Sequence, residues 1–269
     1  FKLNTDIGTD ITFEEIRATH NAVLIATGVY KARDIAAPGS GLEGIVPALD
    51  YLTASNRKSL GDEVADFDSG ILNAEGKDVV VIGGGDTAMD CVRTAIRQNA
   101  KSVSCLYRRD RANMPGSQRE VANAEEEGVD FKWLSAPQAF IGDGAVRAVQ
   151  AQRIHLGQVD ATGRQVPQVI EDSSHELPAD MVIKALGFDP EDIPVMFDET
   201  ALTVSKWGTL SIDWRTMMTS LPGVFAAGDI VRGASLVVWG VRDGRDAAEQ
   251  IDQWIAAEAV TVPAQAASA

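Results

Sequence analysis

A glycine-rich bend between an apolar strand and an amphipathic helix constrains this chain more than any other feature. Asp78 to Ile82 form a nearly unbroken β-branched run, which predicts a parallel strand buried on both faces. The bend Gly83-Gly84-Gly85 follows, and apolar or small residues from Ala88 to Ile96 then recur at the spacing of one buried helical face. A strand, a glycine turn and a helix in this order predict an α/β fold. We expect Asp86 to cap the helix.

The spacing of the glycines predicts a ligand. Gly83-x-Gly85-x-x-Ala88 fits the fingerprint G-x-G-x-x-G/A of dinucleotide-binding proteins. One glycine makes the tight turn, the next lets the backbone approach a pyrophosphate, and the small third residue lets the helix pack on the strand. The first helical residues, Asp86 and Thr87, then present unpaired N–H groups to the phosphates. A bare glycine pattern can also be a tight turn without a ligand, but the flanking strand and helix favour the dinucleotide.

Three arginines after the next strand indicate which dinucleotide it is. Ser102 to Tyr107 predicts the second strand, and Arg108, Arg109 and Arg111 follow it. About 20 residues past the fingerprint, an NAD site places an acidic residue on the ribose, whereas arginine accommodates the 2′-phosphate of NADP. Guanidinium groups match phosphate geometry and keep their charge. The residues therefore favour NADPH, with a solvated basic loop as the alternative.

The composition argues against two classes of partner. The net charge is −15 and the isoelectric point is about 4.6, so neither nucleic acid nor an anionic membrane is expected to bind. Hydrophobic residues make up 45% of the chain and charged residues 23%, as in ordinary globular proteins. No apolar run approaches the ~18 residues of a membrane span. We expect no nucleic-acid and no membrane partner.

Cysteine and histidine are sparse. Cys91 and Cys105 are too few for a disulfide framework, and no Cys/His spacing suggests a metal site. The histidines, His20, His155 and His175, are scattered along the chain. We therefore expect no metal ligands, and a reduced, cytoplasmic location.

Further strands that end in glycine predict a second domain of similar construction. Ala22 to Ala26 leads into Thr27-Gly28, Met181 to Ala185 leads into Gly187, and Gly223 to Ala227 leads into Gly228-Asp229. We expect domain segments at residues 1–72, 73–189 and 190–269.

Other elements follow from local patterns. Capping boxes are expected at Thr12/Glu15 and at Ser117/Glu120. The remaining expected elements are a helix over Ile45–Thr53, a strand over Val129–Trp133, antiparallel strands over Ala145–Ile154 and Val166–Ile170, a hairpin over Thr203–Ile212, and a helix from Ser235 to about Ala257.

Four motifs resemble those of a known family. They are GGGDTAMD from Gly83, YRRDRANMPG from Tyr107, ATG from Ala26, and GVFAAGDIVRGASLVVWGVRDGRDAA from Gly223. They are similar to the small, or β, subunits of bacterial NADPH-dependent glutamate synthases, which are pyridine nucleotide-disulfide oxidoreductase-like flavoproteins. The resemblance extends roughly from Asp10 to Trp254. It is less specific for the exact enzyme, because ferredoxin:NADP reductases and dihydropyrimidine dehydrogenase share similar modules.

The resemblance implies two Rossmann-like dinucleotide-binding domains, with the NADPH domain inserted into an FAD domain. It implies that Gly228 and Asp229 bind the ribityl and pyrophosphate part of FAD, and that Thr27 and Gly28 lie against the same cofactor. A helix start aimed at the pyrimidine end of the flavin is implied for Ser235, Leu236, Val237 and Val238, where the helix N-terminus favours negative charge. Gly187 is grouped with the nucleotide-binding residues.

Two features of the family are missing from this sequence. Its members carry an earlier glycine fingerprint for FAD and an N-terminal cysteine-rich region that binds iron–sulfur clusters. We therefore expect an incomplete FAD domain and a chain that is a fragment, with iron–sulfur clusters only in the missing N-terminal region or in a partner. The partner implied is the large (α) subunit of glutamate synthase or another electron acceptor protein.

The function implied is transfer of hydride from NADPH to FAD, with electrons passed to an iron–sulfur or flavin partner for glutamate synthesis from glutamine and 2-oxoglutarate. The cofactors carry this chemistry, so no catalytic side chain is expected. One alternative is a related NADPH:acceptor flavin reductase, of the ferredoxin:NADP reductase or dihydropyrimidine dehydrogenase type. Another is a non-catalytic NADP(H)-binding module. Thioredoxin reductase is excluded because residues 52–77, before the nucleotide strand, contain no cysteine.

Overall fold

The chain folds into two compact units. The computed structural model describes residues 1–159, 163 and 165–261, with side chains in the last helix described up to Glu258. Unit 1 consists of Phe1–Lys31 and Phe188–Ala269, and unit 2 of Ala32–Gly187. Unit 2 is therefore inserted between the two segments of unit 1, which is the arrangement that the family resemblance implies.

The elements of unit 2 are β3 (Ile45–Pro47), α2 (Ala48–Ser59), α3 (Ala65–Asp68), β4 (Asp78–Ile82), α4 (Asp86–Arg97), β5 (Ser102–Leu106), the 3₁₀ turn η1 (Arg111–Asn113), α5 (Gln118–Glu126), β6 (Asp130–Lys132), β7 (Ser135–Asp143), β8 (Ala145–Val159), β9 (Gln165–Val169), β10 (His175–Pro178) and β11 (Met181–Lys184). Those of unit 1 are α1 (Phe13–Thr19), β1 (Val23–Ile25), α6 (Ile193–Met196), β13 (Val224–Ala226), α7 (Asp229–Arg232) and α8 (Val237–Thr261). The chain passes between the units through β2 (Lys31–Ala32) and β12 (Phe188–Asp189).

The first boundary lies earlier in the chain than the sequence predicted. The expected boundary at residue 72 is wrong, because β3 pairs in parallel with β11 and so belongs to the sheet of unit 2. The helix expected over Ile45–Thr53 is also corrected. Residues up to Pro47 form β3, and α2 begins at Ala48 and buries Tyr51 in the core of unit 2.

Unit 2 is built on a parallel sheet whose described strands run in the order β3-β11-β4-β5-β6. From β4 the chain proceeds through β5 to β6 on one side, and β11 pairs with β4 on the other. The strand order therefore reverses between β4 and β11. In open α/β sheets, ligands bind at such a switch point, at the carboxyl ends of the strands.

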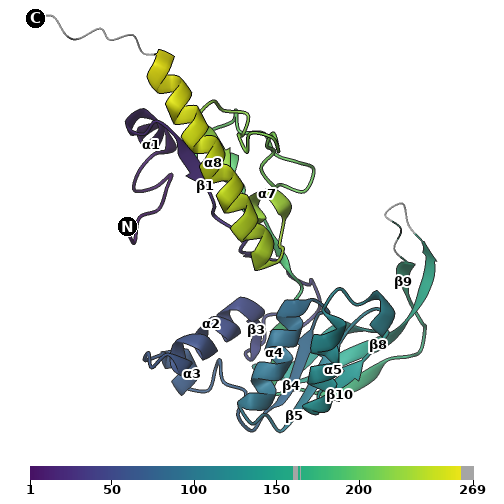
Figure 1. Cartoon of the computed structure of the whole chain (residues 1–269). Coiled ribbons are helices and arrows are strands. Elements are labelled where there is room, and N and C mark those ends of the chain that lie inside the picture. The colour runs from purple at the N-terminus through teal and green to yellow at the C-terminus, as the bar shows by residue number, and fades with distance from the viewer. Residues whose placement is uncertain (160–162, 164, 262–269) are drawn as a thin grey trace, which may run out of the picture. The chain divides into compact units, whose positions relative to one another are not determined.

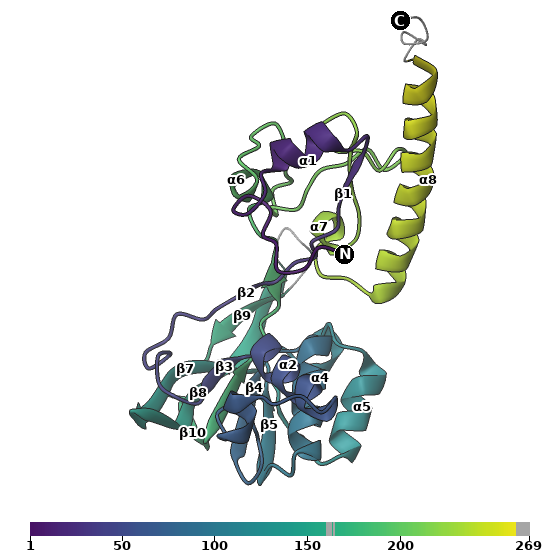
Figure 2. The same ribbon diagram turned by 90° about the vertical axis from the view of Figure 1, so that its left-hand side faces the viewer.

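Strand β4 is buried on both faces, which confirms the prediction made from its run of β-branched residues. Val79 and Val81 pack in the core cluster that contains the apolar face of α4. Val80 and Ile82 pack in the opposite cluster with residues of β7 and β8. Figure 2 shows α2, α4 and α5 on one side of β4 and β5, and β7, β8 and β10 on the other.

The antiparallel layer confirms a second prediction. Strand β8 pairs with β7 on one side and with β10 and β9 on the other, and Ile154 lies opposite Val169 as the alternating pattern implied. The third parallel strand, β6, also lies within the range expected for it.

In the described part of unit 1, β1 and β13 form a parallel pair with Leu24 opposite Phe225. The long helix α8 (Figure 1) packs its Ala247 and Trp254 against Phe225. This helix begins at Val237, two residues later than expected.

Only one of the helix-capping expectations is confirmed. Thr12 and Glu15 form the predicted capping box of α1. In α4 the N-cap is Gly85, and the Asp86 carboxylate accepts a hydrogen bond from the Ser117 backbone N–H instead. In α5 Ser117 is the N-cap without a side-chain hydrogen bond, and the Glu120 carboxylate is paired with Arg93 of α4 and not with the Ser117 backbone.

Candidate nucleotide-binding sites

Each glycine of the bend is present for a different reason. At Gly83 the backbone has a φ of +151°, and an added Cβ would lie 2.1 Å from the carbonyl oxygen of Ala185, the residue that follows β11. At Gly84 a Cβ would lie 2.3 Å from the ring of Tyr107. At Gly85 a Cβ would meet no atom within 4 Å. The first two glycines therefore serve the fold, whereas Gly85 faces open space at the start of α4.

The first turn of α4 leaves hydrogen-bond donors unpaired beside that space. The Gly85 carbonyl accepts the N–H of Ala88 at 2.9 Å and so starts the helix. Within the described residues, the backbone N–H groups of Gly85, Asp86 and Thr87 have no protein acceptor. Unpaired donors at a helix N-terminus, where the helix dipole is positive, favour an anion.

The loop that carries the predicted arginines lies against this bend. We call residues 107–113 the arginine loop. Two hydrogen bonds made just beyond it fix the start of α5 beside the bend. The Gly116 N–H donates to the Gly84 carbonyl and the Ser117 N–H to the side-chain carboxylate of Asp86, each at 2.9 Å. At the other end of the loop, the Tyr107 ring packs against Gly84. The structure thus brings together the two motifs that the sequence combined.

The three arginines differ in what they contact. Arg108 is exposed and has no ion pair or hydrogen bond among the described residues. Arg109 is half-buried and donates from Nε to the carbonyl of Gln165 at 3.4 Å. Arg111 Nη1 donates to both carboxylate oxygens of Glu125, at 2.9 and 2.8 Å. A role for Arg111 in nucleotide binding stays a prediction, since the structure gives its guanidinium another partner.

Gly187 lies beyond the end of β11, on the other side of the switch point from the bend. Its φ of +88° favours glycine, and its carbonyl accepts the backbone N–H of Arg33 at 3.0 Å. Ala185, two residues earlier, contacts the Gly83 position directly. Gly187 is therefore near the carboxyl end of the strand that borders the bend, and its contact with a ligand stays a prediction.

The second candidate site lies in unit 1. Thr27-Gly28 follows β1 and Gly228-Asp229 follows β13, so the parallel pairing of these strands brings both turns to the same end of the pair. The Ala227 N–H donates to the Ile25 carbonyl at 3.1 Å and continues the pairing to the turns.

The two glycines of this second site differ in their surroundings. Both have positive φ values, +75° at Gly28 and +77° at Gly228. A Cβ at Gly28 would lie 2.9 Å from the ring of Tyr30, whereas one at Gly228 would meet nothing within 4 Å. Gly228 in unit 1 thus resembles Gly85 in unit 2, because each has open space where a side chain would lie.

The start of α8 joins this site through a side-chain contact. Ser235 Oγ donates to the Asp229 carboxylate at 2.9 Å. The apolar residues that follow, Leu236, Val237 and Val238, are 59%, 80% and 62% exposed. An exposed apolar run beside a turn with an open glycine is a surface suited to the planar ring of a cofactor.

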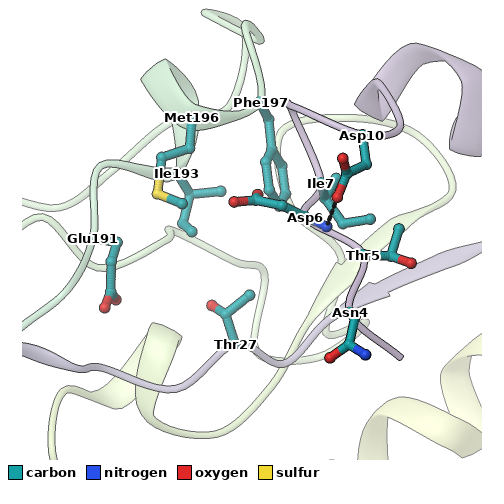
Figure 3. Close-up of a pocket in the computed structure, with 10 residues that line it drawn as sticks. All are labelled: Asn4, Thr5, Asp6, Ile7, Asp10, Thr27, Glu191, Ile193, Met196 and Phe197. Carbon is teal, nitrogen blue, oxygen red and sulfur yellow. Dashed lines mark hydrogen bonds between the residues drawn. The ribbon is translucent and has the colours of Figure 1, made fainter. Parts of the chain in front are cut away.

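Sequence reasoning missed a cavity of about 580 Å³ in unit 1 (Figure 3). Thr27 lines it, opposite Ile193 of α6 and the loop that contains Asp6. Glu191 also lines it, with Oε1 accepting the Tyr30 N–H at 3.1 Å and Oε2 buried without a hydrogen-bond partner among the described residues. No local pattern could have found this cavity, because its walls come from segments far apart in the chain.

The cysteines are unsuited to nucleophilic or redox roles. Cys91 and Cys105 are free and fully buried, and burial raises the pKa of both thiols, that of Cys105 to about 12. Among the described residues, no cluster of His, Cys, Asp and Glu side chains is arranged to hold a metal ion. No helix in the described ranges is long and apolar enough to cross a membrane.

Residues 5–259 match the family model of the pyridine nucleotide-disulphide oxidoreductases. The chain belongs to this family. Its α/β fold is also similar to that of a solved structure, Mycobacterium tuberculosis FprA in complex with NADPH. That structure is similar with a TM-score of 0.73 at 17% sequence identity, over 94% of this chain and 68% of FprA. At this identity the likeness concerns the fold.

Two sequence relatives are much more similar to this chain. The chain is 67% identical over 264 residues to the glutamate synthase [NADPH] small chain of Azospirillum brasilense, covering 98% of this chain and 55% of that protein. It is 65% identical over 260 residues to a putative glutamate synthase [NADPH] small chain of Cereibacter sphaeroides, covering 97% of this chain and 62% of that protein. The chain thus spans somewhat more than half the length of these relatives.

Proposed function

We propose that this chain is an oxidoreductase module that binds NADPH in unit 2 and FAD in unit 1, and that passes electrons from NADPH through FAD to a partner. The proposal rests on one observation. The glycine bend has an open position at Gly85 and N–H groups without acceptors among the described residues, and it lies against a loop whose Arg108 has no partner among those residues either.

The residues of unit 2 fit NADP(H) on chemical grounds. Gly85 leaves room for a pyrophosphate, and the N–H groups of Asp86 and Thr87, which have no acceptor in the described part of the chain, can donate to it. Arg108, with no partner among the described residues, is available for the 2′-phosphate, and Arg109 is its neighbour on the loop. A carboxylate in place of Arg108 would instead favour NAD.

The residues of unit 1 fit part of an FAD site. The open space at Gly228 accommodates a group that a Cβ would exclude, and the Asp229 carboxylate is an acceptor for sugar hydroxyls. The exposed apolar start of α8 offers a surface for the flavin ring. The family resemblance supports this assignment, including the contacts expected of Thr27, Gly28 and Ser235.

When bound, NADPH supplies a hydride that FAD accepts, and the cofactors themselves carry that chemistry. The part of the protein is to bind, orient and shield, so no side-chain acid or base is needed. The burial and raised pKa of both cysteines agree with this, since neither thiol is available as a redox group.

The two close relatives support glutamate synthesis as the process served. Both are named glutamate synthase [NADPH] small chains, one of them a putative one, which supports a large chain as the electron-accepting partner. On this proposal, electrons from NADPH are used to form glutamate from glutamine and 2-oxoglutarate. A cytoplasmic location stays a prediction from the low cysteine content.

A test separates the oxidoreductase from a non-catalytic NADP(H)-binding module. The purified chain is reconstituted with FAD, and the flavin absorbance is followed under anaerobic conditions as NADPH is added. We expect bleaching of the flavin band by NADPH, and much slower bleaching by NADH. Tight NADP⁺ binding, with flavin that stays bound but is not bleached by NADPH, would instead support the binding module.

A further inference from the structure

We infer that Arg111 and Glu125 are positioning residues that hold the arginine loop in the shape that presents Arg108 to a 2′-phosphate. This inference rests on the proposed function of unit 2. It gives Arg111 a different role from direct phosphate contact.

Arg111 is fixed to α5 at both its side chain and its backbone. Its Nη1 donates to both oxygens of Glu125, at 2.9 and 2.8 Å, and its Nε donates to Gln118 Oε1 at 3.4 Å. In return, Gln118 Nε2 donates to the Arg111 carbonyl at 3.1 Å. The guanidinium is thus engaged on two sides by side chains of one helix.

Helix α5 is itself fixed relative to the glycine bend. Val121 and Ala124 are fully buried in the core cluster of unit 2. Glu120 and Glu127 pair with Arg93 of α4. The hydrogen bonds from the Gly116 and Ser117 N–H groups to Gly84 and Asp86 add to these interactions. Together they hold α5 in a fixed position beside the proposed nucleotide site.

The arginine loop has further bonds of its own. Asp110 accepts from the backbone and side-chain N–H groups of Asn113 at 2.9 and 2.7 Å, and the Tyr107 hydroxyl donates to the Asn113 carbonyl at 3.1 Å. These hydrogen bonds join Tyr107 and Asp110 to Asn113 at the end of the loop, and so they hold the loop in a closed conformation. The Arg111–Glu125 pair adds the link between the closed loop and α5, and so sets where Arg108 stands relative to the bend.

The alternative role for Arg111 predicts the opposite sign for one variant. If Arg111 leaves Glu125 to bind the phosphate, Glu125 competes with the ligand, and removing its charge tightens NADP⁺ binding. If the pair positions the loop, removing either partner weakens NADP⁺ binding. The side chains of Arg111 and Glu125 are 46% and 36% exposed, so the effect of the pair is modest.

The test uses calorimetric titration of the full chain with NADP⁺ and NAD⁺. The variants are Glu125→Gln, Arg111→Ala, the combination of both, and the charge exchange Arg111→Glu with Glu125→Arg. Glu126→Gln is the matched control, because Glu126 is exposed on the same helix and has no ion pair among the described residues. Circular dichroism confirms that each variant is folded.

We expect each single variant to raise the Kd of NADP⁺ about three- to tenfold and the Kd of NAD⁺ less than twofold. The combined variant should resemble the single ones, because the two residues act as one unit. The charge exchange should restore most of the NADP⁺ affinity, and Glu126→Gln should change neither Kd.

Three results would overturn the inference. They are tighter NADP⁺ binding by Glu125→Gln, equal losses for both nucleotides, and unchanged affinities in all variants. These results leave the proposed function standing if the unchanged chain binds NADP⁺ more tightly than NAD⁺ and Arg108→Ala removes that preference. A chain without that preference would refute the proposed role of unit 2 itself.

Discussion

Substitution of Gly85 by alanine should separate ligand binding from folding. The backbone at Gly85 has φ −90° and ψ 177°, which any residue adopts, and the added methyl group meets no protein atom within 4 Å. Alanine is a poorer N-cap than glycine by about 0.5–1 kcal/mol. It also reduces the entropy of the unfolded chain, which stabilises by about 0.4–1 kcal/mol. The free energy of unfolding should therefore change by less than about 0.5 kcal/mol.

The affinity for NADP⁺ should nevertheless fall at least tenfold in Gly85→Ala. The methyl group would occupy the space where the pyrophosphate approaches the backbone, and a tenfold loss corresponds to about 1.4 kcal/mol. Gly84→Ala is the matched contrast. Its methyl group would lie 2.3 Å from the ring of buried Tyr107, so it should destabilise the protein by about 1–3 kcal/mol.

The assay combines urea denaturation with calorimetric titration of NADP⁺ for both variants. Stability measured without nucleotide isolates the folding effect, and titration of folded protein isolates the binding effect. A folded Gly85→Ala variant with the NADP⁺ affinity of the unchanged chain would refute the assignment of this position to the pyrophosphate.

Three further predictions concern other residues. Arg108→Ala should weaken NADPH binding by about 1.5–3 kcal/mol and leave NADH binding nearly unchanged, since it removes a charge-assisted hydrogen bond to the 2′-phosphate; parallel titrations test this, and equal losses would refute it. Hydrogen bonds from Lys101 and Ser102 lower the pKa of Asp78 at the start of β4. The stability from a depressed pKa is present above the unfolded value of about 3.9 and is lost as the pH falls through the folded value. Asp78→Asn should therefore cost about 1 kcal/mol at pH 7 and progressively less below about pH 4, as measured by denaturation across pH. Asp243→Ala should destabilise unit 1 by about 2–3 kcal/mol, because it removes the buried partner of Arg232, which retains some solvent access. The exposed pair Arg242–Asp246 is the control, and Asp246→Ala should change thermal stability little.

Local patterns predicted the parts of the molecule that local physics determines. The β-branched run of β4, the apolar face of α4 and the glycine bend follow from residues within one strand–turn–helix unit, and the structure confirms them. The confirmed capping box of Thr12 and Glu15 is equally local. These features depend on spacings of a few residues, which a sequence shows directly.

Long-range partners explain what sequence reasoning missed. The boundary expected at residue 72 failed because β3 pairs with β11, which is distant in the chain. Asp86 does not cap α4, since it is the first residue of the helix after the N-cap Gly85, and its carboxylate accepts a hydrogen bond from the N–H of Ser117, 31 residues later. The Arg111–Glu125 pair was missed for a similar reason, since no spacing rule marks a loop arginine and a helix glutamate 14 residues apart.

The most direct measurement of the central claim is a ³¹P NMR titration of NADP⁺ bound to the chain across pH. If the 2′-phosphate lies at the arginine loop beside the glycine bend, its resonance shifts on binding and its pKa falls, because guanidinium groups favour the dianion. The fall in the pKa should shrink in Arg108→Ala. A 2′-phosphate that titrates as in free NADP⁺ while the nucleotide is bound would contradict the account.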